Sequence, residues 1–156
     1  MTGKLKIDDR KWRAIQAAVQ RMGGSFVSVG VLADQGGSET IGGLTLVEIA
    51  RLHEFGNPAT GLEERSFLRA TLAAHEAEIR AFQAKLVGAI LLGKLTEARA
   101  LDLLGAMVAG LVKKFIYSGQ VQPELAESTI KAKGSSTPLV DTSALVNHIT
   151  HEVVSL

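Results

Sequence analysis

The fold is constrained most by two long apolar stripes that are separated by only three residues. Between residues 66 and 92, apolar side chains recur at helical spacing, at Leu68, Leu72, Ile79, Phe82, Leu86 and Ile90. Between residues 96 and 118 they recur in the same way, at Leu101, Leu104, Val108, Leu111 and Phe115. Ser66 and Thr96 are suited to cap the two helices, and Gly93-Lys94-Leu95 turns the chain between them. Helices joined by so short a connection are expected to pack antiparallel as a hairpin.

Segments near both ends of the chain predict strands. Residues 25–32 place Val27, Val29 and Val31 on one face of a strand, and residues 148–154 predict a closing strand. A helix over about residues 9–22 precedes the first strand, capped by Asp8 or Asp9 and ended by Gly23-Gly24, with one apolar stripe at Trp12, Ile15, Val19 and Met22. We therefore expect one α+β domain spanning residues 1–156, in which a long antiparallel helical hairpin packs on a small β-sheet formed by strands near both ends.

The remaining segments predict a loop and three shorter helices. Residues 34–43 are so rich in glycine that we expect a mobile loop without regular structure. Thr45 and Glu48 fit a capping box, which begins a helix that should end at Gly56. Short helices are predicted near residues 125–133 and 141–147.

Composition excludes several classes of protein. The 156 residues suffice for one domain, and 46% apolar with 21% charged residues is typical of a soluble globular protein. Aromatic residues are only 4%, too few for a base-stacking surface, and the lack of cysteine excludes disulfides, thiolate metal sites and cysteine nucleophiles. The N-terminus does not resemble a signal peptide, and no apolar stretch is long enough to cross a bilayer. We expect a protein made in the cytoplasm, with no membrane partner.

Positive charge is concentrated at the N-terminus, although the net charge is only +1. Residues 1–22 hold six basic residues against Asp8 and Asp9, a balance of +4. Such a segment could contact DNA or an acidic partner, and it could equally be a solvated helix face.

No catalytic motif in the sequence is complete. His53-Glu54 begins a zinc-peptidase signature, but Asn57 stands where the second histidine is needed. Gly88 to Lys94 has the spacing of a phosphate loop, yet Leu95 replaces the magnesium-binding hydroxyl residue. We therefore expect no catalytic residue, no cofactor, no metal site and no small-molecule substrate, and predict that the protein is not an enzyme.

Two groups of motifs resemble a known family. The first is the run His53-Glu54-Phe55-Gly56 at the end of a short helix, followed by Arg65-Ser66-Phe67-Leu68-Arg69. The second includes Thr129 and Lys133 and leads to Pro138-Leu139-Val140-Asp141-Thr142. Their order and spacing resemble the neck and tail-completion proteins of long-tailed bacteriophages, including the virion-morphogenesis proteins of Mu-like prophages. The resemblance spans roughly residues 26–154, and it departs from the family pattern at Ser66 and Ser143, where members usually have proline and glycine.

The motif residues also have a direct physical interpretation. Phe55 and Phe67 are expected to anchor the core, and Gly56 to stop a helix. Glu54 could pair with Arg65 or Arg69 and fix the loop between them. Asp141 or Thr142 is expected to cap the last short helix.

The resemblance implies a structural protein of the virion, located at the head–tail junction. Family members form rings, so a homo-oligomeric ring, expected to be hexameric, and contacts with neighbouring neck, tail-terminator or tail-tube proteins follow from it. The basic N-terminal segment could then face DNA in the lumen, and the 34–43 loop could reach a neighbouring subunit.

Two other functions stay open. A tail terminator that caps the tail tube has a similar small α/β build but lacks the two motif groups. A small nucleic-acid-binding regulator would need a basic recognition helix, and the near-neutral overall charge disfavours it.

Overall fold

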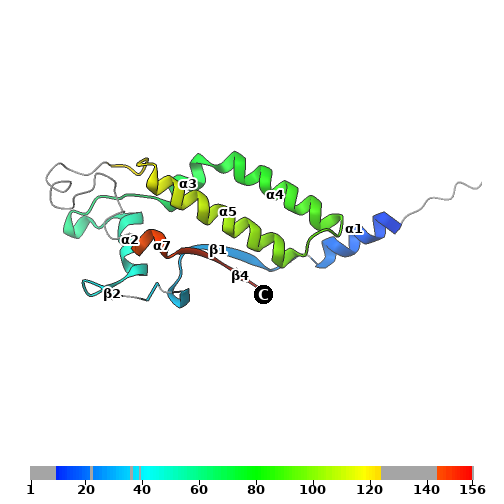
Figure 1. Ribbon diagram of the computed structural model, residues 1–156, viewed down its shortest axis with the longest axis horizontal. Coiled ribbons are helices and arrows are strands. Elements are labelled where there is room, and N and C mark those ends of the chain that lie inside the picture. The colour runs from blue at the N-terminus through cyan, green and yellow to red at the C-terminus, as the bar shows by residue number, and fades with distance from the viewer. Residues whose placement is uncertain (1–9, 22, 36, 39, 124–143, 156) are drawn as a thin grey trace, which may run out of the picture.

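Two long antiparallel helices, α4 (Glu76–Leu91) and α5 (Glu97–Tyr117), form the main body of the fold (Figure 1). The computed structural model describes residues 10–21, 23–35, 37–38, 40–123 and 144–155. Thr96 caps α5 by accepting a hydrogen bond from the backbone N–H of Arg99 at 3.3 Å, as predicted. Gly93 makes the turn between the helices with φ 70°, a left-handed conformation that suits glycine. The predicted helical hairpin is confirmed.

The hairpin packs on a two-stranded antiparallel sheet. Strand β1 (Phe26–Val31) pairs with β4 (Ile149–Val154), so that Phe26 lies opposite Val154 and Val31 opposite Ile149. Helix α5 makes the main contacts with both strands, and the sheet lies below it in Figure 1. The predicted α+β class, with a sheet built from strands near both ends of the chain, is confirmed.

Close approach of the sheet to α5 depends on a glycine inside the helix. A Cβ atom at Gly105 would lie 2.6 Å from Cγ2 of Val27 and would also overlap the ring of His151. Those two residues belong to β1 and β4, so Gly105 is the point where both strands meet the helix. A glycine within a helical stripe is a known sign of such close packing.

The buried core gathers at one end of the hairpin. Helices α2 (Leu46–Phe55) and α7 (Ala144–Asn147) contact each other there and share a buried cluster with the C-terminal half of α5 and the start of β4. The most deeply buried apolar side chains of this cluster are Phe67, Val112, Ile116, Val121, Val146 and Ile149. Because aliphatic residues fill most of this volume, the low aromatic content agrees with the observed core.

The segment predicted as one helix over residues 66–92 is two helices. Helix α3 (Leu68–Ala74) and α4 are separated at His75, whose φ of −112° and ψ of 16° are not helical. Thr71 is fully buried instead of Leu72, which is 45% exposed. Thr71 can be buried because its hydroxyl donates to the carbonyl oxygen of Phe67 at 2.5 Å. Because of this break, α3 packs on the core, whereas α4 packs along α5.

The expectation that residues 34–43 lack regular structure is wrong. A 3-10 turn (Ala33–Gln35) is followed by the short strands β2 (Thr40–Ile41) and β3 (Leu44–Thr45), which pair as a hairpin. Gly37 ties the segment to the body, because its N–H donates to Leu32 at 2.9 Å and its carbonyl accepts from Val47 at 3.0 Å. Backbone hydrogen bonds give this segment regular structure, which its amino-acid composition does not predict.

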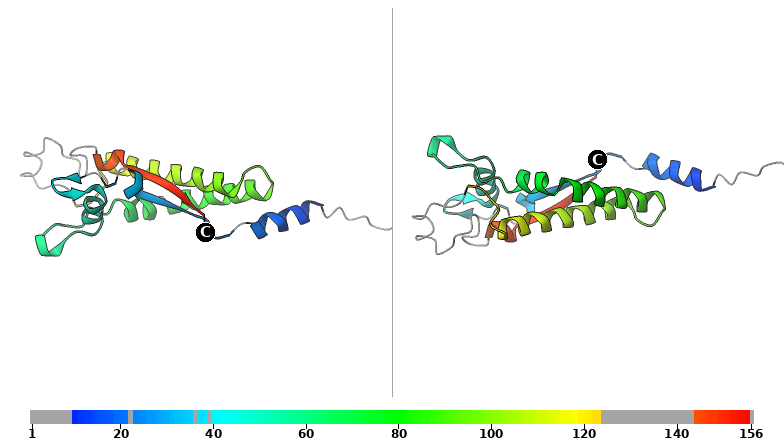
Figure 2. Two further views of the ribbon diagram at one scale, coloured as in Figure 1. Left: turned by 90° about the horizontal axis from the view of Figure 1, so that it is seen from below. Right: turned by 90° about the horizontal axis from the view of Figure 1, so that it is seen from above.

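Helix α1 (Arg10–Arg21) projects beyond the connecting end of the hairpin, as all views show (Figures 1 and 2). Its predicted caps Asp8 and Asp9, together with Met22, lie outside the described residues, as does the helix predicted near 125–133. Two members of its predicted stripe are largely exposed, Trp12 at 60% and Val19 at 54%. Among the described helices, none is sufficiently long and apolar to span a membrane.

Candidate functional site

The first motif group is assembled where α2 ends and α3 begins. The predicted capping box at Thr45 and Glu48 fixes the start of α2, and Gly56 ends it with φ 68°. A Cβ atom at Gly56 would lie 2.8 Å from the backbone N of Glu64 and the carbonyl O of Leu62. Glycine is therefore needed for the returning chain to pass close to the end of the helix.

Glu54, in the last turn of α2, is the centre of this site. Its side chain is 4% exposed, and its Oε2 atom accepts the backbone N–H groups of Phe67 and Leu68, both at 2.9 Å. Its Oε1 atom accepts the hydroxyl of Ser66 at 2.8 Å, the N–H of Arg69 at 3.1 Å and the Nε–H of Arg69 at 2.9 Å. We name Glu54 with residues 66–69 the Glu54 latch.

The latch is an N-terminal cap supplied by another helix. The first backbone N–H groups of a helix have no partner within it, and the helix dipole favours a negative charge there. Phe67, at the N-cap position of α3, makes no side-chain capping bond. The carboxylate of Glu54 fulfils that role and joins α2 to α3.

The electrostatics of the latch keep Glu54 ionised. Burial alone raises the pKa of its carboxyl group, but the hydrogen bonds from the backbone of Leu68, Arg69 and Phe67 and from the hydroxyl of Ser66 outweigh it. The net effect lowers the pKa of Glu54 below its ordinary value.

Two arginines extend the latch to neighbouring segments. The Nη2 group of Arg69 donates to the carbonyl of Glu54 at 2.6 Å and to Oε1 of Glu64 at 2.9 Å, and the guanidinium lies 4.8 Å from the ring centre of Phe55. The N–H of Arg65 donates to the carbonyl of His53 at 2.7 Å. Its Nε–H donates to the carbonyl of Pro123 at 3.2 Å, so Arg65 connects the loop to the segment after α5.

Several predictions for these residues are confirmed, and the prediction for Phe55 is wrong. Glu54 pairs with Arg69, one of the two alternatives, and Phe67 is a fully buried core anchor. Phe55 is 59% exposed and lies beneath Arg69 rather than in the core. Ser66 lies one residue before the N-cap position, and its hydroxyl donates to Glu54 and accepts the backbone N–H of Ala70 at 3.3 Å, so it helps to cap α3 as predicted. The last six motif residues lie outside the described residues: Thr129, Lys133, Pro138, Leu139, Asp141 and Thr142.

A second polar cluster, which the sequence analysis missed, joins β4 to α5. Nε2 of His151 lies 3.0 Å from Oδ1 of Asp102, and Arg99 pairs with the other oxygen of the same carboxylate. The hydrogen bond with His151, and then the charge of Arg99, lower the pKa of Asp102. Gly105, three residues on, was the available signal of close packing at this point.

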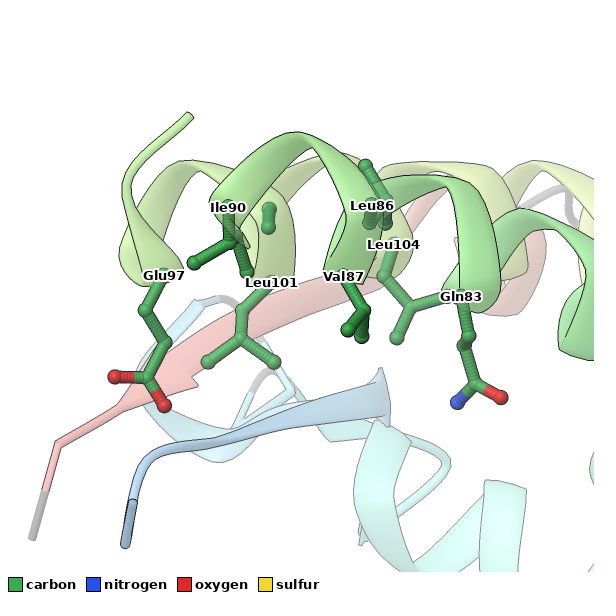
Figure 3. Close-up of a pocket in the computed structure, with 8 residues that line it drawn as sticks. Gln83, Leu86, Val87, Ile90, Glu97, Leu101 and Leu104 are labelled. Carbon is green, nitrogen blue, oxygen red and sulfur yellow. The ribbon is translucent and has the colours of Figure 1, made fainter. Parts of the chain in front are cut away.

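An apolar groove lies between α4 and α5, with a volume of about 360 Å³. Figure 3 shows Val87, Leu101 and Leu104 pointing into the same space. Of the eight residues that line it, Gln83 and Glu97 are polar and the other six are apolar: Leu86, Val87, Ile90, Ala100, Leu101 and Leu104. The groove can therefore receive apolar side chains, with one carboxylate at its edge.

Within the part of the chain that the structure describes, no three histidine, aspartate or glutamate side chains are grouped to hold a metal ion. The Glu54 latch is saturated by hydrogen bonds from the protein itself. Its arrangement is suited to holding two helices together. Comparisons of the chain with models of protein families, with curated proteins and with solved structures gave no match.

Proposed function

We propose that this chain is a structural protein of a long-tailed bacteriophage, a neck or tail-completion subunit at the head–tail junction. The observation that carries the proposal is the Glu54 latch. Residues 53–56 and 65–69, the two runs of the first motif group, contact one another through Glu54 and Arg69. The first motif group therefore holds two helices rigidly together, as a subunit of a larger assembly would require.

The surface of the molecule supports an assembling protein. Within the described residues, β1 and β4 pair only with each other, so each leaves one edge open. Strand β1 contains no charged residue and no proline, the usual means by which edge strands avoid unwanted pairing. Helix α1 adds an exposed apolar stripe beyond the body of the fold. These are surfaces that neighbouring subunits would cover.

The proposal is tested by removing the gene from a prophage that encodes the chain and inducing the phage. We expect full heads and separate tails by electron microscopy, with joining restored by the wild-type gene supplied in trans. Tails of abnormal length would indicate the tail terminator instead. A normal yield of joined particles would contradict both functions.

A further inference from the structure

Helix α1 has large apolar side chains that the described residues leave more than half exposed. Trp12 and Val19 lie seven residues apart, which places them on one face of the helix two turns from each other. Both are more than half exposed. Ala14 and Ala18, on a different side of the helix, and Ile15, at the edge of the same stripe, face the connecting end of the hairpin across a hollow of about 850 Å³.

The groove between α4 and α5 is a complementary surface on the same molecule. Val87 on its wall is 42% exposed, and the side chains of Leu101 and Leu104, both half-buried, point the same way as Val87 in Figure 3. Its volume of about 360 Å³ suits a few apolar side chains rather than a whole helix. A helix lying along the groove and inserting two side chains would fill it, as in helix-in-groove recognition.

Charge favours α1 as the helix that enters. Residues 10–21 contain Arg10, Lys11, Arg13 and Arg21 and no acidic residue. Glu97 is the charged residue among the eight that line the groove. The basic helix would therefore place its positive charge beside the carboxylate.

The α1 helix that enters the groove must come from another copy. The molecule's own α1 already lies beside the connecting end of the hairpin and turns the side that carries Ala14 and Ala18 toward it. That hollow and the groove share Ile90 and Glu97, so the two sites are continuous. A second α1 in the groove would extend an apolar surface that the first one begins.

We propose that α1 of one copy docks its Trp12 and Val19 face into the α4–α5 groove of the next copy. One patch then meets a different patch, a heterologous interface that closes into a ring when the rotation between copies allows it. The inference deepens the proposed function, on which its biological meaning rests, by naming the surfaces through which subunits of a neck ring would join.

The first test is self-association of the full chain, measured by analytical ultracentrifugation over a wide range of concentration. Val19→Glu damages the helix face, and Val87→Glu damages the groove. Each should raise the apparent Kd for self-association at least about tenfold, because a charge would be buried against apolar side chains. The matched controls Gln20→Glu and Ala84→Glu, exposed neighbours on the same helices outside the contact, should leave it unchanged.

Mixing the two damaged proteins gives the decisive result. A Val19→Glu copy retains its groove and a Val87→Glu copy retains its helix, so together they should form a dimer with one intact interface. Neither variant should form a species larger than this dimer. A symmetric interface between identical patches would not be restored by mixing.

Crosslinking covers weak association, and the chain has no native cysteine to interfere. Copies with Val19→Cys and copies with Val87→Cys, mixed and oxidised, should give a disulfide-linked dimer, whereas Gln20→Cys in place of Val19→Cys should not. Absence of both the dimer and self-association would overturn the inference. A chain that carries both Val19→Cys and Val87→Cys, stays monomeric and forms the disulfide within itself would also overturn it.

These outcomes are independent of the gene-removal experiment. Crosslinked copies together with normal phage particles would refute the neck function but not the docking. Unjoined heads and tails without any crosslink would refute the docking but not the function.

Discussion

At the scale of single residues, Glu54 makes the most specific contribution to the fold. Glu54→Ala leaves the N–H groups at the start of α3 and the guanidinium of Arg69 without their buried partner. We expect the free energy of unfolding to fall by about 2–4 kcal/mol, the range for a broken buried polar network. Glu54→Gln, which keeps one acceptor oxygen, should cost about half as much. Urea unfolding measures both, and Glu63→Gln, an exposed acid in the same loop, should change the value by less than about 0.5 kcal/mol.

The lowered pKa of Glu54 predicts how this contribution depends on pH. A carboxyl group with a folded pKa below its unfolded value stabilises the fold above the unfolded pKa, about 4.3 for glutamate. That stability is lost as the pH falls through the folded pKa. The difference in unfolding free energy between the wild type and Glu54→Gln should therefore shrink when the pH is lowered from 7 to about 3. Urea titrations at several pH values that gave a constant difference would contradict this assignment.

The sequence allowed part of the latch to be predicted. A Glu–Arg pair was expected from the motif, and Arg69 was one of its two named partners. The capping of α3 by Glu54 was not predicted, because a carboxylate that caps a helix other than its own leaves no local signature. The exposure of Phe55 was not predicted for a related reason. An aromatic residue at the end of a helix is expected in the core, and only the position of Arg69 over its ring shows otherwise.

At the scale of elements, the packing of the sheet on α5 depends on the absence of a side chain at Gly105. An alanine in a helix normally gains about 1 kcal/mol over glycine, and Gly110→Ala in the same helix should show this gain because nothing lies within 4 Å of its Cβ position. Gly105→Ala should instead lower the free energy of unfolding by about 1–3 kcal/mol, since its Cβ would press on Val27 and His151. Denaturant unfolding of the two variants compares them directly. Equal effects of both would mean that the strands move away without cost.

Elements with strong local signals were predicted well, and those fixed by their surroundings were not. Thr45 with Glu48, and Thr96, mark helix starts that the structure confirms. The break at His75 has no proline or glycine to signal it. The order of the 34–43 segment comes from backbone hydrogen bonds at Gly37, which no side-chain pattern records.

At the scale of the whole molecule, the fold divides into a body that holds the core and a projecting helix. The buried cluster contains residues of α2, α3, α5, α7 and β4, and no described residue of α1. Stability and association should therefore be separable. The strands near both ends close the body, while α1 lies beyond the point where β1 begins (Figure 2).

Removing residues 1–22 tests this division and the suggestion that the basic segment meets DNA. The free energy of unfolding should fall by less than about 1 kcal/mol, because none of the described residues that the truncation removes belongs to the core. Retention on heparin should fall, since the segment holds six basic residues against two acidic ones and attraction to sulfate or phosphate follows that charge. A full-length variant with Arg10, Lys11 and Arg13 changed to Gln keeps the helix and should lose heparin retention. Its association with other copies should weaken, because the charge beside Glu97 is reduced, but should persist through Trp12 and Val19. If the full chain elutes at the same low salt as the truncated chain, the basic segment has no affinity for polyanions, and a role facing DNA is excluded.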